Sequence, residues 1–179
     1  MQVLDKEFEL YITHEEILNK VKALAEELNK DYNGKCPIMV CILNGAFIFA
    51  ADLVREVNFP VEIGFMKYSS YVGLDTVGTV DKVADLAQDV KGRDIIVVED
   101  IIDTGYTMER ILCDFKEKGA ASVKVACLLQ KPKKLITNIK VDYCALDIKN
   151  EFIVGYGLDY NGHGRNLKDI YILSPDDND

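Results

Sequence analysis

Three carboxylates stand within five positions of one short segment of the chain. In "VVEDIIDTGYT", residues 97–107, apolar pairs flank the adjacent acids Glu99 and Asp100, and Asp103 opens a turn of small and hydroxylated residues. Mutual repulsion and loss of hydration both oppose folding when carboxylates gather in this way. Their presence therefore indicates that the segment binds something, either a metal ion or a ligand whose hydroxyl groups donate hydrogen bonds to the acids.

The turn after these acids has the features of an anion site. Thr104 and Thr107 supply hydroxyl donors, Gly105 permits close backbone approach, and the turn leads into an expected helix whose N-terminal N–H groups favour negative charge. A phosphorylated ribose would use both parts, because it carries a phosphate for the turn and hydroxyl groups or a metal-bound pyrophosphate for the acids. The simpler alternative is that Asp103 only caps the helix while the other two acids lie exposed in a loop.

The hydrophobic pattern of the 179-residue chain predicts how this segment is positioned. Apolar runs typical of buried strands alternate with patterns typical of helices, so we expect one α/β domain, residues 1–179, with a mainly parallel sheet flanked by helices on both faces. Ligands of such sheets bind at the carboxyl ends of the strands, where Glu99 and Asp100 lie. The expected strands are 37–43, 61–68, 94–100 and 122–129, with shorter candidates at 141–146, 152–156 and 170–173. The expected helices follow a capping box at 13–16, the turn at 44–45 and the turn at 103–107.

Charge and composition exclude several classes of protein. Acids outnumber bases 30 to 21, for a formal charge of -9, and no basic cluster is visible, which argues against binding of nucleic acid or an anionic membrane surface. We find no leader-like segment and no apolar run long enough to span a bilayer, so a cytoplasmic location is expected. The five cysteines lack CxxC spacing and are expected to be small buried thiols in a reducing compartment.

The segment "VVEDIIDTGYTM" closely resembles the phosphoribosyl-pyrophosphate motif of the type I phosphoribosyltransferases. Three further segments, "LNGAFIFAADLVREV", "LLQKP" and "FIVGYGLDYNGHGRNL", are similar to those of the hypoxanthine-guanine branch, and the resemblance runs from about residue 8 to 173. It implies that family's fold, with a small hood subdomain built from N-terminal residues and about 140–179, and a flexible flap at about 66–80. The implied reaction belongs to purine salvage. It is Mg²⁺-dependent transfer of 5-phosphoribosyl from phosphoribosyl pyrophosphate to N9 of a 6-oxopurine, hypoxanthine or guanine, which gives IMP or GMP and pyrophosphate.

The resemblance assigns roles to the acidic segment. Glu99 and Asp100 would hold the ribose hydroxyl groups and Mg²⁺, and Asp103 would act as general base at purine N7. The ribosyl carbon becomes oxocarbenium-like as pyrophosphate leaves, so the acids would also stabilise positive charge there. The turn that would cradle the 5-phosphate consists of Asp103, Thr104, Gly105, Tyr106 and Thr107.

The resemblance also assigns residues to the purine. Lys131 would donate to the 6-oxo oxygen, which selects hypoxanthine and guanine over adenine, because an amino group cannot accept that bond. Phe152 would stack on the base, and the backbone of Ile153 would read its edge. Without the resemblance, a lysine that follows a strand is more often solvated, and the two apolar residues are more often part of the core.

The pyrophosphate end is assigned in the same way. Arg165 would clamp pyrophosphate, since a planar guanidinium suits it, and Asp159 would meet a second Mg²⁺. Asn44 and Gly45 lie where the family uses a cis peptide, here Leu43-Asn44, whose amide reaches pyrophosphate.

The chain departs from the family pattern near this end. Asn44 occupies a position that is often basic, Ala46 stands where Gly or Ser is common, and Glu151 stands where a lysine is frequent, so affinity for pyrophosphate is where we expect a difference. Two alternatives to the leading function remain, a xanthine-preferring phosphoribosyltransferase and a non-catalytic nucleotide-binding regulator on the same fold. By analogy with the family, a homodimer or homotetramer is expected.

Overall fold

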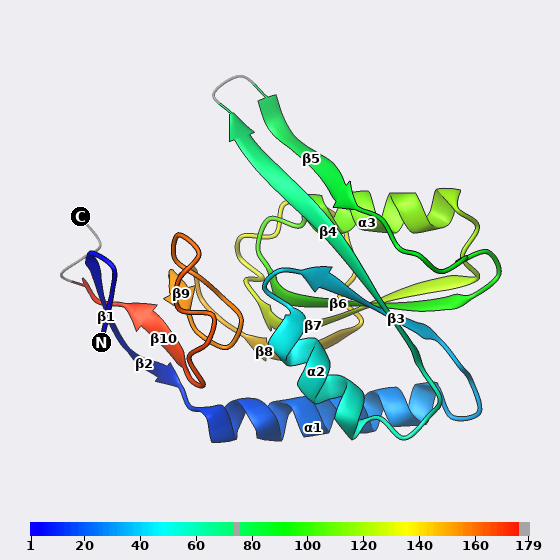
Figure 1. Ribbon diagram of the computed structural model, residues 1–179, viewed down its shortest axis with the longest axis horizontal. Helices are drawn as coiled ribbons and strands as arrows, with labels where there is room; N and C mark the ends of the chain where they lie inside the picture. The colour runs from blue at the N-terminus through cyan, green and yellow to red at the C-terminus, as the bar shows by residue number, and fades with distance from the viewer. Residues whose placement is uncertain (74–75, 176–179) are drawn as a thin grey trace.

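A six-stranded sheet forms the body of the molecule (Figure 1). The structure is a computed structural model that describes residues 1–73 and 76–175, and it describes side chains for all of these except residues 69–81. Within the described residues, neighbouring strands are parallel except for β4 and β5. The order is β5 (Thr76–Ala84), β4 (Glu62–Gly73), β3 (Ile38–Leu43), β6 (Asp94–Ile102), β7 (Ser122–Gln130) and β8 (Tyr143–Asp147). This confirms the predicted α/β fold with a mainly parallel sheet.

The direction of the strand order reverses between β3 and β6. The chain proceeds from β3 outward to β4 on one side, and from β6 outward to β7 and β8 on the other. Such a reversal leaves the carboxyl ends of the two central strands open between diverging connections, which is where α/β sheets bind ligands. The loop after β3 and the turn after β6 therefore lie at the same edge of the sheet.

Helices cover both faces of the sheet. The helices α1 (His14–Asp31) and α2 (Phe47–Glu56) lie on one face, and α3 (Tyr106–Glu117) lies on the other (Figure 1). The start of α1 has the expected capping box, because Thr13 Oγ1 accepts a hydrogen bond from the N–H of Glu16, and Glu16 Oε2 accepts one from the N–H of Thr13.

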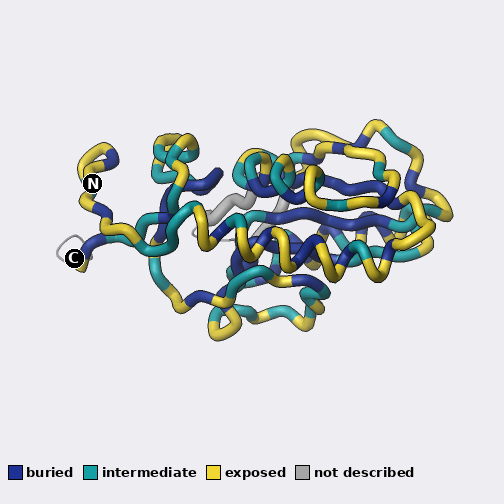
Figure 2. The backbone as a smooth tube through the Cα atoms, turned by 90° about the horizontal axis from the view of Figure 1, so that it is seen from below, coloured by how far each residue is buried: buried dark blue, intermediate teal, exposed yellow. Residues whose placement is uncertain are grey.

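The core is divided by the sheet into two apolar layers. Along β6, Ile96 and Val98 pack toward α1 and α2, whereas Ile95 and Val97 pack toward α3. This alternation follows from the pleat of a strand that is buried on both faces. Figure 2 shows the buried residues concentrated in these central strands. The rigid central strands provide a fixed base for the acids at their carboxyl ends.

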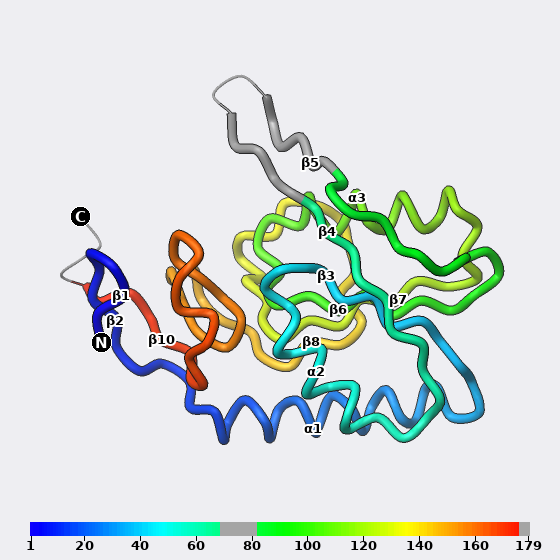
Figure 3. Tube along the Cα trace, viewed as in Figure 1, coloured from blue at the N-terminus to red at the C-terminus, as the bar shows by residue number. Residues whose placement is uncertain are grey.

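A second, antiparallel sheet stands beside the first and joins the two ends of the described chain (Figure 3). Its order is β1 (Gln2–Val3), β2 (Lys6–Ile12), β10 (Ile170–Leu173) and β9 (Ile153–Val154). The hood was expected to begin near residue 140, but β8 lies in the larger sheet. It pairs in parallel with β7, and the Tyr143 hydroxyl donates a 2.6 Å hydrogen bond to Asp31 of α1.

The segment expected to form a flap lies on a long antiparallel hairpin. Strands β4 and β5 pair from Lys67 with Ala84 to Gly73 with Thr76, and the hairpin extends beyond the sheet (Figure 1). Residues 74–75 and the side chains of 69–81, which include most side chains of the flap expected at 66–80, lie outside what the structure describes.

Two further expectations concern the cysteines and the membrane. All five cysteines are free, but Cys36, Cys113 and Cys144 are exposed, so the prediction of buried thiols is right only for Cys41 and Cys127. Among the described helices, none is both long and apolar enough to cross a bilayer.

Candidate active site

Two acids lie near the carboxyl end of β6, and of these Glu99 is buried and Asp100 is half-buried. Glu99 is only 9% exposed, so the alternative in which these acids lie in an open loop is wrong. The N–H of Asp100 donates to Glu99 Oε1 at 3.2 Å, and the N–H of Ile101 donates to Asp100 Oδ1 at 2.8 Å. Burial raises the pKa of both carboxyl groups, and the charge of Asp100 raises that of Glu99 further.

These acids fit a magnesium ion that is shared with a ligand. In the part of the chain that the structure describes, no salt bridge reaches Glu99 or Asp100, so neither carboxylate is paired directly with a cation. No group of three or more potential ligand side chains occurs among the described residues. Mg²⁺ commonly binds one or two carboxylates, keeps several waters and takes its other oxygens from substrate phosphates. Two adjacent acids match that requirement.

The loop after β3 packs directly on Asp100. The Leu43-Asn44 peptide is cis, as the resemblance implied, and Asn44 is exposed. A Cβ atom added to Gly45 would lie 1.6 Å from Asp100 Oδ2, and one added to Gly157 would lie 2.1 Å from the carbonyl oxygen of Gly45. Glycine is therefore required at position 157, where a methyl group would meet backbone, and a methyl group at position 45 would displace the Asp100 carboxylate.

Arg165 and Asp159 come to the same place from the loop between β9 and β10. The guanidinium of Arg165 forms a 2.6 Å ion pair with Asp159 Oδ1 and donates a 2.6 Å hydrogen bond to the carbonyl oxygen of Gly157. The positive charge of Arg165 counters the burial that raises the pKa of Asp100, so Arg165 lies near that acid. Asp159 also accepts from the N–H of Gly162 at 2.7 Å, which leaves its carboxylate paired within its own loop.

The turn after β6 presents backbone N–H groups. Gly105, at φ +92°, is the N-cap of α3 and makes no side-chain cap, so the alternative in which Asp103 only caps this helix is wrong. The first intrahelical bond runs from the N–H of Glu109 to the carbonyl oxygen of Gly105 at 2.9 Å, and the N–H groups of Tyr106 and Thr107 precede it. Those groups have no acceptor within the helix and are available to an anion.

Asp103 lies between two lysines. Its Oδ2 accepts a 2.9 Å hydrogen bond from Lys134 Nζ and lies 3.7 Å from Lys131 Nζ, whereas its Oδ1 is buried and has no hydrogen-bond partner. Lys131 is 7% exposed, so it is not a solvated lysine, and burial lowers its pKa although the charge of Asp103 opposes this. Because Oδ1 accepts no hydrogen bond from the described residues, its lone pairs remain for a proton, and a general base uses them once it comes within hydrogen-bond reach of the substrate.

Two of the residues assigned to the purine, Phe152 and Ile153, come from the small sheet and the residue before it, whereas Lys131 follows β7 of the larger sheet. Phe152 is a large apolar side chain that is 45% exposed, and its ring meets Tyr160 edge-on at 5.8 Å between centroids. The side chain of Ile153 is buried, and its strand β9 pairs with β10. Glu151 lies near Lys131, since its charge raises the pKa of that lysine, and Glu151 Oε2 is buried without a partner.

Sequence reasoning missed Lys134 and Gly157. Lys134 belongs to the basic run "KPKK" at 131–134, and Gly157 belongs to "GYGLDY" at 155–160. Both segments can be read in the sequence, but neither one indicates that Lys134 contacts Asp103 or that Gly157 packs on Gly45.

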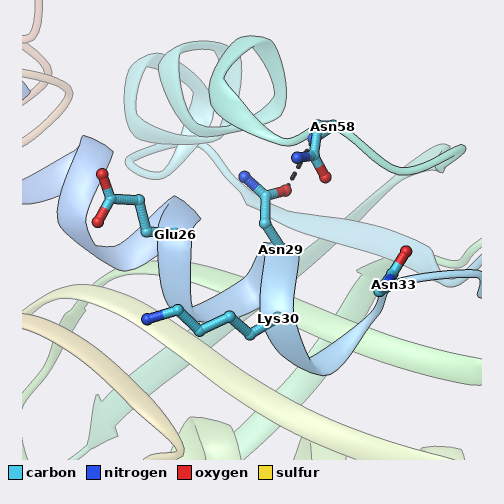
Figure 4. Close-up of a pocket in the computed structure, with 5 residues that line it drawn as sticks. All are labelled: Glu26, Asn29, Lys30, Asn33 and Asn58. Carbon is cyan, nitrogen blue, oxygen red and sulfur yellow. Dashed lines mark hydrogen bonds between the residues drawn. The ribbon is translucent and has the colours of Figure 1, made fainter.

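A separate surface depression of about 640 Å³ is lined by Glu26, Asn29, Lys30, Asn33 and Asn58 (Figure 4). It lies where the end of α1 meets the connection from α2 to β4. Asn29 Oδ1 accepts a 2.7 Å hydrogen bond from the N–H of Asn58, and Asn29 Nδ2 donates to the carbonyl oxygen of Glu56 at 3.3 Å. The hydrogen bonds of Asn29 therefore connect α1 to the end of α2 and the segment after it. None of the residues assigned to the reaction lines this depression.

Comparison with known proteins agrees with this arrangement. The phosphoribosyl transferase domain family matches residues 10–161. The hypoxanthine-guanine phosphoribosyltransferase of Streptococcus pneumoniae (strain ATCC BAA-255 / R6) is 47% identical over 163 residues, which are 90% of this chain and 91% of that protein. The protein of the same name from Lactococcus lactis subsp. lactis (strain IL1403) is 44% identical over 175 residues, 97% and 95% of the two chains. A crystal structure of a hypoxanthine phosphoribosyltransferase from Staphylococcus aureus has a TM-score of 0.90 at 37% identity and covers 96% of this chain and 94% of that one. The chain therefore belongs to the phosphoribosyltransferase family, and within it to the hypoxanthine-guanine phosphoribosyltransferases.

Proposed function

We propose that this chain performs the purine-salvage reaction of its family at the carboxyl ends of β3 and β6. The 5-phosphoribosyl group passes from phosphoribosyl pyrophosphate to N9 of hypoxanthine or guanine, and pyrophosphate is released. The observation that carries this proposal is Asp103, whose buried Oδ1 has no donor although two lysines stand beside Oδ2. A free basic oxygen next to a helix N-terminus and an acid pair without a salt bridge among the described residues suits a phosphorylated substrate that loses a proton.

We assign the donor to the acid pair and the following turn. The 5-phosphate accepts hydrogen bonds from the turn of Asp103, Thr104, Gly105, Tyr106 and Thr107, and the ribose hydroxyl groups donate to Glu99 and Asp100. Glu99 and Asp100 would hold Mg²⁺, which would offset their negative charge and that of the leaving pyrophosphate. The acids also face the ribosyl carbon, where positive charge develops.

We assign the acceptor purine to Lys131, Phe152 and Ile153. The Lys131 ammonium donates to the 6-oxo oxygen, the exposed ring of Phe152 covers one face of the base, and the backbone of Ile153 reads its edge. The proton on purine N7 moves to Asp103 Oδ1 while N9 bonds to the ribosyl carbon and the bond from that carbon to pyrophosphate breaks. An adenine would place an amino donor against Lys131 and is rejected.

We assign pyrophosphate to Arg165, Asn44 and Gly45. Arg165 is already oriented by Asp159, so its guanidinium is positioned beside Asp100 before the ligand arrives. A role of Asp159 at a second Mg²⁺ requires its carboxylate to leave Arg165. Pyrophosphate provides the replacement partner for that arginine.

We also propose that the chain forms a homodimer or homotetramer through an apolar patch of Phe47, Ile63 and Phe65. These side chains are between 44% and 53% exposed. Ile63 and Phe65 pair with Met39 and Cys41 of β3, so they face the same side of the sheet as α2. Large apolar side chains gathered on one face indicate a protein interface.

The free thiols fit a cytoplasmic location.

The test of the function is release of pyrophosphate in the presence of Mg²⁺ and phosphoribosyl pyrophosphate, with hypoxanthine, guanine, xanthine or adenine supplied separately. Turnover with hypoxanthine and guanine and none with adenine is the expected result. Faster turnover with xanthine would support the xanthine-preferring alternative, because Lys131 recognises an oxygen that xanthine shares. Binding of the donor without turnover on any base would support the non-catalytic regulator.

A further inference from the structure

The two lysines beside Asp103 are placed differently. Lys134 Nζ donates to Asp103 Oδ2 at 2.9 Å, whereas Lys131 Nζ lies 3.7 Å from the same oxygen, which is longer than a direct hydrogen bond. The side chain of Lys131 is 9% exposed and that of Lys134 is 42% exposed. The outer lysine therefore holds the carboxylate, and the inner lysine keeps its donors for another acceptor.

A backbone turn brings Lys134 to this position. The N–H of Lys131 donates to the carbonyl oxygen of Ile102 at 2.9 Å, which fixes the end of β7 against the end of β6. The N–H of Lys134 then donates to the carbonyl oxygen of Lys131 at 2.9 Å, and Pro132 occupies the second position of this four-residue turn. Proline favours that position because its φ is fixed near the required value. Lys133, at the third position, is exposed and forms none of the salt bridges found among the described residues.

We propose that Lys134 is a positioning residue for the general base. It fixes Oδ2 of Asp103 so that Oδ1 remains turned to the purine N7 proton, and it satisfies the carboxylate so that Lys131 is not drawn away from the 6-oxo oxygen. Without Lys134 the nearest cation to Asp103 is Lys131, only 3.7 Å away, and the two would form a direct pair. This inference rests on the proposed function, because it takes Asp103 as the base and Lys131 as the purine ligand.

The test compares Lys134→Met with Lys134→Arg and with Lys133→Met, the matched control on the same turn. We expect Lys134→Met to lower kcat roughly tenfold and to raise the KM for hypoxanthine by a similar factor, with the KM for phosphoribosyl pyrophosphate unchanged. Lys134→Arg keeps a charged donor and should recover most of the loss, and Lys133→Met should match the wild type. A Lys134→Met enzyme that matches Lys133→Met would overturn the inference.

A double-mutant cycle separates positioning from a general structural effect. In an Asp103→Asn background the carboxylate that Lys134 orients is gone, so adding Lys134→Met should lower kcat by less than about twofold. A tenfold further loss in that background would show that Lys134 acts independently of Asp103 and would overturn the inference. A wild-type enzyme that releases no pyrophosphate with hypoxanthine would instead refute the proposed function, and the inference with it.

Discussion

Asp103 has a different environment from the two acids that precede it. Glu99 is buried and Asp100 is half-buried, and neither forms a salt bridge among the described residues, whereas Asp103 is partly exposed and has lysines beside one oxygen only. The first arrangement suits ligation of a metal and hydroxyl groups, and the second suits proton transfer. The roles proposed for the three neighbouring carboxylates therefore follow from their different surroundings on the strand and in the turn.

The role of Asp103 predicts the effect of Asp103→Asn. An amide cannot take the N7 proton, so kcat should fall about 100-fold or more. The KM for phosphoribosyl pyrophosphate should change little, because the backbone of the turn remains. Steady-state kinetics of pyrophosphate release measure both quantities, and an unchanged kcat would remove Asp103 from its role.

At the scale of elements, the loop between β9 and β10 is held to α2 by Tyr156. This side chain is fully buried, and its hydroxyl donates to Asp52, which is also paired with Arg55. Burial and the neighbouring carboxylate raise the pKa of Tyr156, so the hydroxyl stays protonated as a donor. This hydrogen bond fixes the loop that carries Asp159 and Arg165 near the carboxyl end of β3.

We expect Tyr156→Phe to lower the free energy of unfolding by about 1–3 kcal/mol, because a hydrogen bond to a carboxylate is lost in a buried site. Tyr160→Phe is the matched control, since its hydroxyl donates to Asp5 in an exposed position at 3.0 Å. Urea denaturation compares the two variants. Equal stability losses would show that Tyr156 does not hold the loop in the way described.

The junction of β7 and β8 predicts a pH dependence. Burial alone would raise the pKa of Asp142, but hydrogen bonds from Lys124 and from the N–H of Val125 lower it below its usual range. The stabilisation from Asp142 is present when the pH lies above the pKa of an aspartate in the unfolded chain, about 3.9, and it is lost as the pH falls through the pKa in the folded protein.

Asp142→Asn should therefore be less stable than the wild type at pH 7, and its stability should decline less on acidification below about pH 4. Urea unfolding at pH 7 and pH 3 measures the difference between the two proteins. If the free energies of unfolding of the wild type and of Asp142→Asn fall by the same amount between pH 7 and pH 3, the assignment of this stabilisation to Asp142 is contradicted.

Most regular elements could be predicted because local pattern and tertiary packing agree. The capping box of α1, the apolar runs of β3, β6 and β7, and even the short strand β10 follow from residues near in sequence. The membership of β8 could not be predicted, because a short apolar run does not reveal which sheet it joins. The contact of Lys134 with Asp103 depends on a turn that joins two strands, and the cis peptide depends on packing around it.

At the scale of the whole molecule, both sheets contribute residues to the proposed active site. The larger sheet provides the acids, the turn and the lysines, and the small sheet provides Phe152 and begins the loop that carries Arg165. Because β2 pairs with β10, residues far apart in the sequence hold this small sheet together (Figure 3). The purine and the donor are therefore expected to meet between the two sheets.

The apolar patch of Phe47, Ile63 and Phe65 predicts a change of assembly. Phe65→Asp places a charge in the proposed interface and should shift the protein to monomers at micromolar concentration. Leu10→Asp is the control, since Leu10 is 56% exposed on β2, away from the patch. Sedimentation velocity measures both, and a wild type that is already monomeric would refute this interface.

The central claim is that the acid pair and the turn after β6 bind the two ends of one activated pentose. The most direct measurement is a crystal structure of the Asp103→Asn enzyme with Mg²⁺ and phosphoribosyl pyrophosphate. We predict the 5-phosphate on the N–H groups of residues 104–107 and the ribose hydroxyl groups on Glu99 and Asp100. A donor bound elsewhere, with no phosphate at that turn, would contradict the account.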